Sequence, residues 1–217
     1  MLTSNRPTDA YYQSDRRGLL PLIPRQGSRL LDIGCGEGAF ALMLKQELGY
    51  TEIWGMEMDE KAARSAASRL TRVLDGDAVA RLDELPDGYF DLICMNDFLE
   101  HIIWPEEFLI RLRAKLSPDG RIFCSIPNLR HFRLIWNLLQ FQDFEYTDQG
   151  LLDRTHIRFF TVRTFLSLLK RAGYAPVSVT GSGGATKSWK FKILNALTIW
   201  RSEDMRHAQF FFQAKPV

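Results

Sequence analysis

The sequence predicts a doubly wound α/β fold, in which helices cover both faces of a mostly parallel sheet. Short apolar runs alternate with helical patterns along the chain, which is typical of parallel strands joined by crossover helices. One apolar run passes directly into three closely spaced glycines and a helix-forming stretch, which indicates a sharp turn from strand to helix. With 217 residues the chain is long enough for one well-filled core, so we expect a single domain spanning 1–217.

Seven strands and four helices account for most of this alternation. We expect strands at Arg29–Ile33, Glu52–Glu57, Arg72–Leu74, Phe90–Met95, Arg121–Ile126, Ala175–Thr180 and Ala208–Ala214. Helices fit between them at Phe40–Leu48, Glu60–Leu70, Pro105–Leu116 and Val162–Ala172. Pro105 suits a first helical turn, where its missing N–H is not needed, and Gly173 suits a helix end. Two segments, His131–Thr155 and Gly181–Arg201, do not fit the alternation and are interpreted as insertions.

The glycine turn is the first candidate ligand site. Gly34, Gly36 and Gly38 are spaced Gly-x-Gly-x-Gly and follow Asp32. Dinucleotide-binding turns have the longer spacing Gly-x-Gly-x-x-Gly, so this turn does not specify a pyrophosphate site. Glycines still allow a backbone to approach a ligand closely, and the following helix offers N–H groups to a polar ligand.

An acidic residue ends the second predicted strand. Glu57 lies roughly 20 residues beyond the glycines, the distance at which a carboxylate can accept hydrogen bonds from ribose hydroxyls. Asp59 also follows this strand, but its position favours the N-cap of the next helix. We therefore assign Glu57 to the ribose of an adenosine-type ligand.

Polar residues follow the third and fourth strands as well. Gly76-Asp77-Ala78 comes directly after the third strand, and Asn96-Asp97-Phe98-Leu99-Glu100-His101 comes after the fourth. In an open parallel sheet the ligand crevice lies at the carboxyl ends of the strands. These side chains are therefore expected to meet the glycine turn at one edge of the sheet.

Together these motifs resemble those of the class I S-adenosylmethionine-dependent methyltransferases, over about Tyr11 to Gly173. The resemblance implies a Rossmann-like sheet with an antiparallel last strand, S-adenosylmethionine as cofactor and S-adenosylhomocysteine as product. It assigns the cofactor contacts as follows: Asp32 and the Gly34, Cys35 and Gly36 backbone hold the methionine end, Glu57 the ribose, Met58 one adenine face, Asp77 and Ala78 the adenine edge, and the Asn96 carbonyl accepts from the ligand amino group.

Two later segments indicate which branch of this methyltransferase family the chain resembles. Ile126–His131 and Leu152–Thr161 look like segments of bacterial methyltransferases associated with polysaccharide assembly, and are similar to the branch that O-methylates quinone-type phenols. The resemblance implies O-methylation of a small-molecule, saccharide or lipid-linked acceptor, without choosing among them. A module that binds the cofactor without catalysis would lose polar groups at the acceptor mouth, and a nicotinamide-dependent oxidoreductase would show the longer glycine spacing.

Candidate catalytic residues are Glu100, His101 and His156. If a helix begins at the end of the fourth strand, Asp97, Glu100 and His101 share one face, and the resemblance suggests that the chain returns to the same mouth at His156. Such a cluster would act as general base on an acceptor hydroxyl, bind a divalent metal ion, or form a structural hydrogen-bond network. The pattern resembles the acid-x-x-Glu-His of small-RNA and quinone methyltransferases, with Asp97 shorter than the Glu of the RNA branch.

The two insertions have their own predictions. The aromatic-rich segment 131–155 is predicted to form a lid over the acceptor, with plain helix packing or a dimer surface as alternatives. Lys187–Arg201 predicts a helix packed on the sheet edge; its lysines, Trp189, Ile193, Leu197 and Trp200 also suit peripheral contact with an anionic membrane.

Composition excludes several classes of partner. The formal charge is only +2, from 28 basic and 26 acidic residues, so nucleic acid is not favoured as a partner. No stretch approaches a membrane-spanning length, and the polar start shows no apolar signal region. Cys35, Cys94 and Cys124 lack metal-type spacing and are typical of reduced, buried residues, so we expect a cytoplasmic protein. Nothing in the pattern specifies an oligomeric state.

Overall fold

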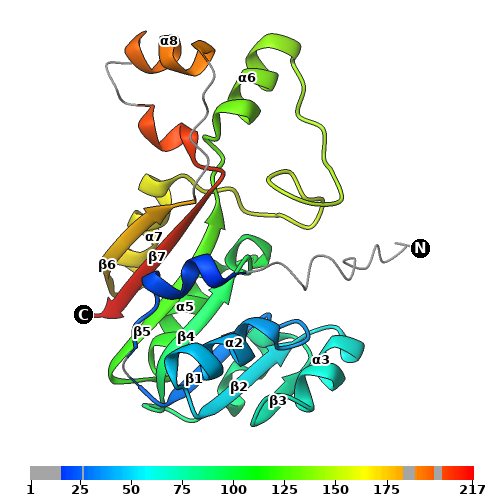
Figure 1. Cartoon of the computed structure of the whole chain (residues 1–217), viewed down its shortest axis with the longest axis vertical. Coiled ribbons are helices and arrows are strands. Elements are labelled where there is room, and N and C mark those ends of the chain that lie inside the picture. The colour runs from blue at the N-terminus through cyan, green and yellow to red at the C-terminus, as the bar shows by residue number, and fades with distance from the viewer. Residues whose placement is uncertain (1–15, 26, 183–188, 198–201) are drawn as a thin grey trace.

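The computed structural model describes residues 16–25, 27–182, 189–197 and 202–217, and builds them around one seven-stranded sheet (Figure 1). The sheet order is β3-β2-β1-β4-β5-β7-β6, and β7 alone runs antiparallel to its neighbours. The strands are β1 Arg29–Ile33, β2 Glu52–Glu57, β3 Arg72–Asp75, β4 Phe90–Asn96, β5 Leu116–Pro127, β6 Tyr174–Gly181 and β7 Gln209–Pro216. The predicted doubly wound fold with an antiparallel last strand is confirmed.

Helices cover both faces of this sheet. The α-helices are α2 Ala39–Leu48, α3 Glu60–Ala67, α4 Ala78–Arg81, α5 Pro105–Arg113, α6 Phe132–Phe141, α7 Val162–Arg171 and α8 Trp189–Leu197, and the 3-10 helices are η1 Arg17–Leu22, η2 Leu82–Glu84, η3 Leu99–His101 and η4 Glu203–Arg206. Apolar residues of α2 and α3 pack on one face, and those of α4, α5 and α7 pack on the other. The strands between them are therefore buried on both sides, as parallel strands require.

Side chains alternate along the central strands, so the core has two parts, one on each face of the sheet. Leu31 and Ile33 of β1 face the α5 and α7 layer, whereas Leu30 faces α2. All three cysteines are buried free thiols, with Cys35 and Cys94 on the α2 side and Cys124 on the other. Their interpretation as reduced, buried residues is confirmed.

Two predicted helix ends are wrong. The helix from Pro105 stops at Arg113, because Leu116 begins β5 and pairs with Phe90 across a register shift in the ladder. The helix from Glu60 stops at Ala67, before the chain turns into β3. Pro105 does occupy the first turn of α5, and Gly173 follows α7 with a positive φ of 80°.

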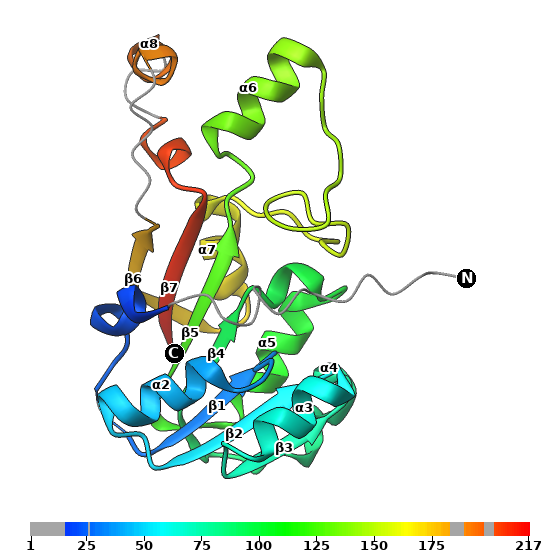
Figure 2. The same cartoon turned by 45° about the vertical axis from the view of Figure 1, so that its right-hand side comes forward.

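Helices α6 and α8 stand beyond the sheet at one end of the molecule (Figures 1 and 2). Their inner sides meet in a small cluster of Phe132, Phe191 and Met205, in which the rings of Phe132 and Phe191 are edge to face at 5.6 Å. The predicted packing of the Lys187–Arg201 helix on the sheet edge is wrong, since Phe191 finds its apolar partners on α6 and η4. The segment 198–201, with Trp200, lies outside the described residues, as do Tyr11 and Tyr12.

Across the described ranges, no helix is both long enough and apolar enough to span a bilayer.

Candidate active site

Three glycines form the turn between β1 and α2. Gly34, Gly36 and Gly38 have φ angles of 73°, 55° and 81°, a region that strains residues with a Cβ. The N–H groups of Gly34 and Cys35 donate to the carbonyl of Met56 on β2, at 2.8 and 3.1 Å. These bonds fix the turn at the carboxyl ends of β1 and β2.

Glu57 joins the ends of three neighbouring strands. Its side chain accepts from the N–H of Gly36 at 2.8 Å and from the N–H of Asp59 at 2.9 Å. Its backbone carbonyl accepts from the N–H of Gly76 beyond β3, at 2.8 Å. Asp59 in turn caps α3 by accepting from Ala62 at 2.9 Å, which confirms its role as N-cap and leaves Glu57 as the acid at the crevice.

Asp32 is a buried carboxyl beside this turn. Because side chains alternate along a strand, it shares the α2 face with Leu30. Burial raises the pKa of Asp32 to about 7; the positive charge of Arg16 lowers it and the negative charge of Glu57 raises it. The group therefore changes its protonation state near neutral pH, where an ammonium or sulfonium partner would favour its ionised form.

Asn96 places a second buried polar group on the same face, at the end of β4. Both its Nδ2 and its Oδ1 are buried, and neither has a hydrogen-bond partner among the described residues. A buried polar group left unpaired costs about 1–3 kcal/mol. A polar ligand in the crevice would satisfy this amide as well as the adjacent backbone carbonyl.

The remaining predicted cofactor residues lie at the ends of β2 and β3. Met58 follows Glu57 and is 75% exposed, which leaves its side chain available as a surface for a ring. Asp77 caps the short helix α4 by accepting from Val79 at 2.7 Å, and Ala78 is buried as its first residue. Their assignment to the adenine stays a prediction.

We expect Asp32→Asn to change the stability of the cofactor-free protein in a pH-dependent way. Since the folded-state pKa lies above the ordinary 3.8, the native state binds more protons than the unfolded state between those values, and this carboxyl loses stability as pH rises from about 4 to 7. The variant should match the wild type near pH 4 and exceed its free energy of unfolding above pH 8 by on the order of 3 kcal/mol. Urea unfolding at each pH measures this, and a difference that does not vary with pH would contradict it.

Glu100, His101 and His156 come together on the other side of the crevice. The carbonyl of Glu100 accepts from the N–H groups of Ile157 and Arg158, both at 3.0 Å, which docks the distant segment beside η3. One ligand-type atom from each of the three residues lies within 4.8 Å of the others. The predicted grouping of these three residues is therefore present in the structure.

Hydrogen bonds orient both imidazoles of this cluster. Nδ1 of His101 lies 3.1 Å from the Thr155 carbonyl, and Nδ1 of His156 lies 3.2 Å from the Leu151 carbonyl. A carbonyl oxygen only accepts, so each Nδ1 donates a proton to it, and the neutral form of each ring has its lone pair on Nε2. The two rings meet edge to face at 4.9 Å, and Nε2 of His156 lies 3.9 Å from Oε1 of Glu100.

Burial dominates the electrostatics of the cluster. Glu100 is only 1% exposed, and burial raises the pKa of its carboxyl well above the ordinary value, with Asp97 adding to the rise. Burial also lowers the pKa of His101, and the neighbouring His156 ring lowers it further. Neither oxygen of Glu100 has a hydrogen-bond partner among the described residues. The cluster therefore offers a carboxyl group and two imidazole nitrogens to a ligand.

Asp97 does not share a helical face with the cluster, so that part of the prediction is wrong. Only Leu99–His101 forms a helical turn, and Asp97 lies outside it with a left-handed φ of 52°. Its carboxylate binds Arg16 at 3.1 Å and accepts from Ser125 at 3.0 Å and from Gln209. These partners tie the end of β4 to β5, β7 and the start of the described chain.

The match to a known family decides what this crevice belongs to. A model of the methyltransferase domain matches residues 5–179 of the chain. The chain is a member of that family. The methyltransferase is 29% identical over 180 residues to malonyl-[acyl-carrier protein] O-methyltransferase of Geobacter sulfurreducens, covering 79% of this chain and 67% of the relative. It is 28% identical over 187 residues to ubiquinone biosynthesis O-methyltransferase of Roseobacter denitrificans, covering 82% and 72%.

Solved structures agree on the fold. The methyltransferase matches a SAM-dependent methyltransferase from Archaeoglobus fulgidus with a TM-score of 0.66, 23% identity and coverage of 91% of each chain. The cofactor of this family is S-adenosylmethionine. The residues at this edge of the sheet fit it, because Gly34 and Gly36 place no Cβ at the turn, and the buried Asp32 and the unpaired Asn96 amide are polar groups that a charged ligand would complete.

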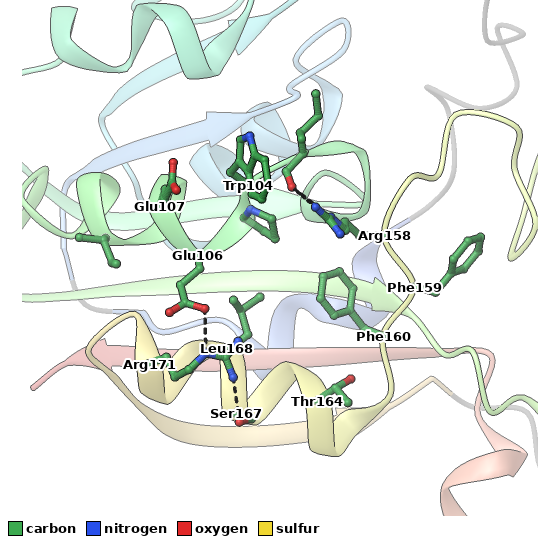
Figure 3. A pocket seen from close by; sticks show the side chains of 13 residues that line it. Trp104, Glu106, Glu107, Arg158, Phe159, Phe160, Thr164, Ser167, Leu168 and Arg171 are labelled. Carbon is green, nitrogen blue, oxygen red and sulfur yellow. Dashed lines mark hydrogen bonds and ion pairs between the residues drawn. The ribbon is translucent and has the colours of Figure 1, made fainter.

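The methyltransferase has an open hollow lined in part by His156 of the cluster, and a second hollow that shares Phe159 with the first. One, of about 450 Å³, is lined by Tyr146, Arg154, His156, Ile157 and Phe159. The other, of about 660 Å³, runs between α5 and α7 and includes Trp104, Arg158 and Phe160 (Figure 3). An ion pair from Glu106 to Arg171, at 2.7 Å, crosses it, and Phe159 lines both hollows. Space for an acceptor thus exists directly beside His156.

The sequence pattern missed the role of Arg16. Arg16 forms an ion pair with Asp97, and its charge lowers the pKa of Asp32, so it places a positive charge near both carboxyl groups. No local signal marks it, since the partner lies 81 residues away. Phe144 contacts the rings of Tyr146 and Phe159. The first two belong to the aromatic-rich segment that the sequence marked, whereas the part played by Phe159, which lies beyond that segment, was not predicted.

Proposed function

We propose that this methyltransferase O-methylates a small-molecule, saccharide or lipid-linked acceptor. The observation that carries the proposal is the group of buried Glu100, buried His156 and half-buried His101 beside an open, aromatic-lined hollow. S-adenosylmethionine supplies a methyl group on a sulfonium, a good leaving group, so the protein must mainly orient the acceptor, exclude water and remove its proton. Two relatives, malonyl-[acyl-carrier protein] O-methyltransferase and ubiquinone biosynthesis O-methyltransferase, support oxygen as the acceptor atom.

The cofactor-side residues would hold the reagent in place. Asp32 and the glycine-turn backbone would receive its methionine end, Glu57 the ribose and Asp77 with Ala78 the adenine edge. Met58 would cover one ring face, and the Asn96 carbonyl would accept from the amino group. This arrangement would direct the methyl group toward the Glu100 cluster, since Glu100 and His101 follow Asn96 within one short turn.

A divalent cation fits the cluster. Two neutral imidazole Nε2 atoms and a carboxylate oxygen are donors that first-row divalent metals accept together, and each imidazole has the Nδ1–H to carbonyl bond typical of a ligating histidine. A cation there would supply the charge that ionises the buried Glu100 and lowers the pKa of an acceptor hydroxyl. Without one, an imidazole Nε2 would take the hydroxyl proton as general base.

The decisive experiment incubates the protein with S-adenosylmethionine and panels of phenols, sugars and lipid-linked acceptors, and measures formation of S-adenosylhomocysteine. The methyl position in the product is then assigned by NMR. A methyl ether supports the proposal. A methyl group on carbon or nitrogen rejects O-methylation, and cofactor binding with no turnover across the panels favours a binding module.

Chelation separates the two forms of the proposal. We expect removal of divalent ions to lower turnover by about 100-fold or more, because the acceptor hydroxyl then loses its Lewis acid. Adding back Mn²⁺ or Zn²⁺ should restore activity, while S-adenosylmethionine affinity, measured by calorimetry, should not change. Turnover that resists chelation would reject the metal and leave the imidazoles as general bases.

A further inference from the structure

The last turn of α6 and the side of α8 opposite Phe191 expose large apolar side chains. Leu139 is 74% exposed and Trp189 66%, and Leu138, Phe141 and Ile193 are exposed as well. Inside, the two helices share only the small cluster of Phe132, Phe191 and Met205 with its half-buried neighbours Ile135 and Trp136. Large apolar side chains gathered on a projecting surface indicate an interaction site rather than a core.

The charge on these helices has one sign. The α6 sequence contains Arg133 and the α8 sequence contains Lys190 and Lys192, and neither contains an acidic residue. Arg133 and Lys192 are exposed. Around α8, the whole stretch 182–202 lacks Asp and Glu. Apolar and cationic side chains on the same short helices are the combination that binds the headgroup and acyl boundary of an anionic bilayer.

The base of this pair of helices is firmly attached, so the exposed surface is held in place. The side chain of Asn128, at the end of β5, donates to the carbonyls of Asp204 and His207 at 2.8 and 2.9 Å. Asn195 of α8 binds Glu203 at 2.6 Å and accepts from the N–H of Ser202 at 3.1 Å. The acidic side chains at the base are also engaged, Asp204 with Arg130 and Glu203 with Arg206.

The location relates this surface to the active site. Helix α6 follows the carboxyl end of β5, the same edge of the sheet at which β4 delivers Glu100 and His101. In Figures 1 and 2 the last turn of α6 and the whole of α8 form the end of the molecule farthest from β3. A bilayer under this end would lie on the acceptor side of the crevice.

We propose that the last turn of α6 and the side of α8 opposite Phe191 form a membrane-docking surface that rests on an anionic lipid bilayer. Leu138, Leu139, Phe141, Trp189 and Ile193 enter the interface, and Arg133 and Lys192 contact lipid phosphates. The charge around α8 favours lipid over a second copy of this chain, since a symmetric contact through α8 would bring Lys192 of both copies together within a stretch, 182–202, that contains no acidic residue. The surface exists whether or not the acceptor itself is a lipid.

The test is co-sedimentation of the purified full chain, without cofactor, with vesicles of phosphatidylcholine containing 30% phosphatidylglycerol. We expect binding at low salt that weakens at high salt and on pure phosphatidylcholine. Leu139→Ser with Phe141→Ser should weaken binding at least about tenfold, and so should Trp189→Ser, because the buried apolar area supplies much of the affinity. Lys192→Glu with Arg133→Glu should remove the preference for the anionic lipid.

Val177→Ser on β6 is the matched control, since it removes an exposed apolar side chain elsewhere. It should bind vesicles like the wild type, and thermal unfolding should show that all variants fold. Failure of the wild type to bind at low salt, or equal binding by every variant, overturns the proposal. So does sedimentation that finds a dimer abolished by the same α6 and α8 substitutions, because the surface then contacts a second copy. None of these readouts depends on methyl transfer.

Discussion

Glu100→Gln is expected to lower turnover by about 100-fold or more, the range typical of losing acid–base assistance. The substitution keeps the size of the side chain and removes its capacity for charge, so it replaces a carboxylate that could bind a cation by a weaker amide ligand beside His156. His101→Ala and His156→Ala should cause losses of similar size if, as proposed, the three side chains act on one hydroxyl. The measurement is S-adenosylhomocysteine formation at saturating acceptor and cofactor.

The structure also predicts how these losses combine. Residues that act as a unit give non-additive effects, so Glu100→Gln with His156→Ala should be little worse than either variant alone. Stability should not fall in Glu100→Gln, because burial already disfavours the ionised carboxylate. His207→Gln is the matched control: His207 bonds to the carbonyl of Ser182 at 2.6 Å, away from the cluster, and its loss should leave turnover within about twofold. Full activity in the cluster variants would remove the proposed site.

The strands that form the crevice were predictable because local sequence signals mark where each strand ends. Arg29–Ile33 and Glu52–Glu57 match the structure at both ends. The glycine turn terminates the first, and Glu57 with the capping Asp59 terminates the second. Carboxyl ends of parallel strands meet at one edge, so the positions of Asp32, Glu57, Asp77 and Asn96 followed from the strand assignments.

Asp97 shows why the rest was not predictable. The spacing of Asp97, Glu100 and His101 allows a helix, and nothing within the run favours a left-handed residue. The conformation at Asp97 depends on Ser125 and Gln209, which lie 28 and 112 residues away. Long-range contacts of this kind override local spacing. As a result Asp97, which was expected in the cluster, pairs with Arg16 instead.

The helix predicted in Lys187–Arg201 is present at Trp189–Leu197, but its packing was predicted wrongly, for a different reason. Its apolar residues indicate that one side is buried, but they do not say against which surface. Its inward residue Phe191 packs with Phe132 and Met205, which belong to elements distant in sequence. His156 was placed correctly only because its segment carried a family resemblance, since the hydrogen bonds from Ile157 and Arg158 to Glu100 leave no pattern in the sequence.

Glu57→Ala is expected to weaken S-adenosylmethionine binding by roughly 1.5–3 kcal/mol, or about 10- to 150-fold in Kd, as for lost hydrogen bonds to a charged group. Part of this cost has a structural origin. Without ligand, Glu57 accepts from the N–H groups of Gly36 and Asp59, so its removal also loosens the glycine turn. Titration calorimetry measures the affinity, and Glu60→Ala, an exposed acid at the start of α3, is the matched control.

A double-mutant cycle distinguishes contact with the ribose from support of the turn. S-adenosylhomocysteine and its 2′,3′-dideoxy analogue are titrated into the wild type and Glu57→Ala. If the carboxylate binds the hydroxyls, the analogue loses affinity for the wild type but little for the variant, and the two changes are non-additive. If Glu57 only holds Gly36 and Asp59 in place, the losses add, because removing the hydroxyls leaves the turn unchanged. Additive losses would therefore reject the ribose assignment even when Glu57→Ala binds weakly, and an unchanged Kd in the folded variant would reject both roles.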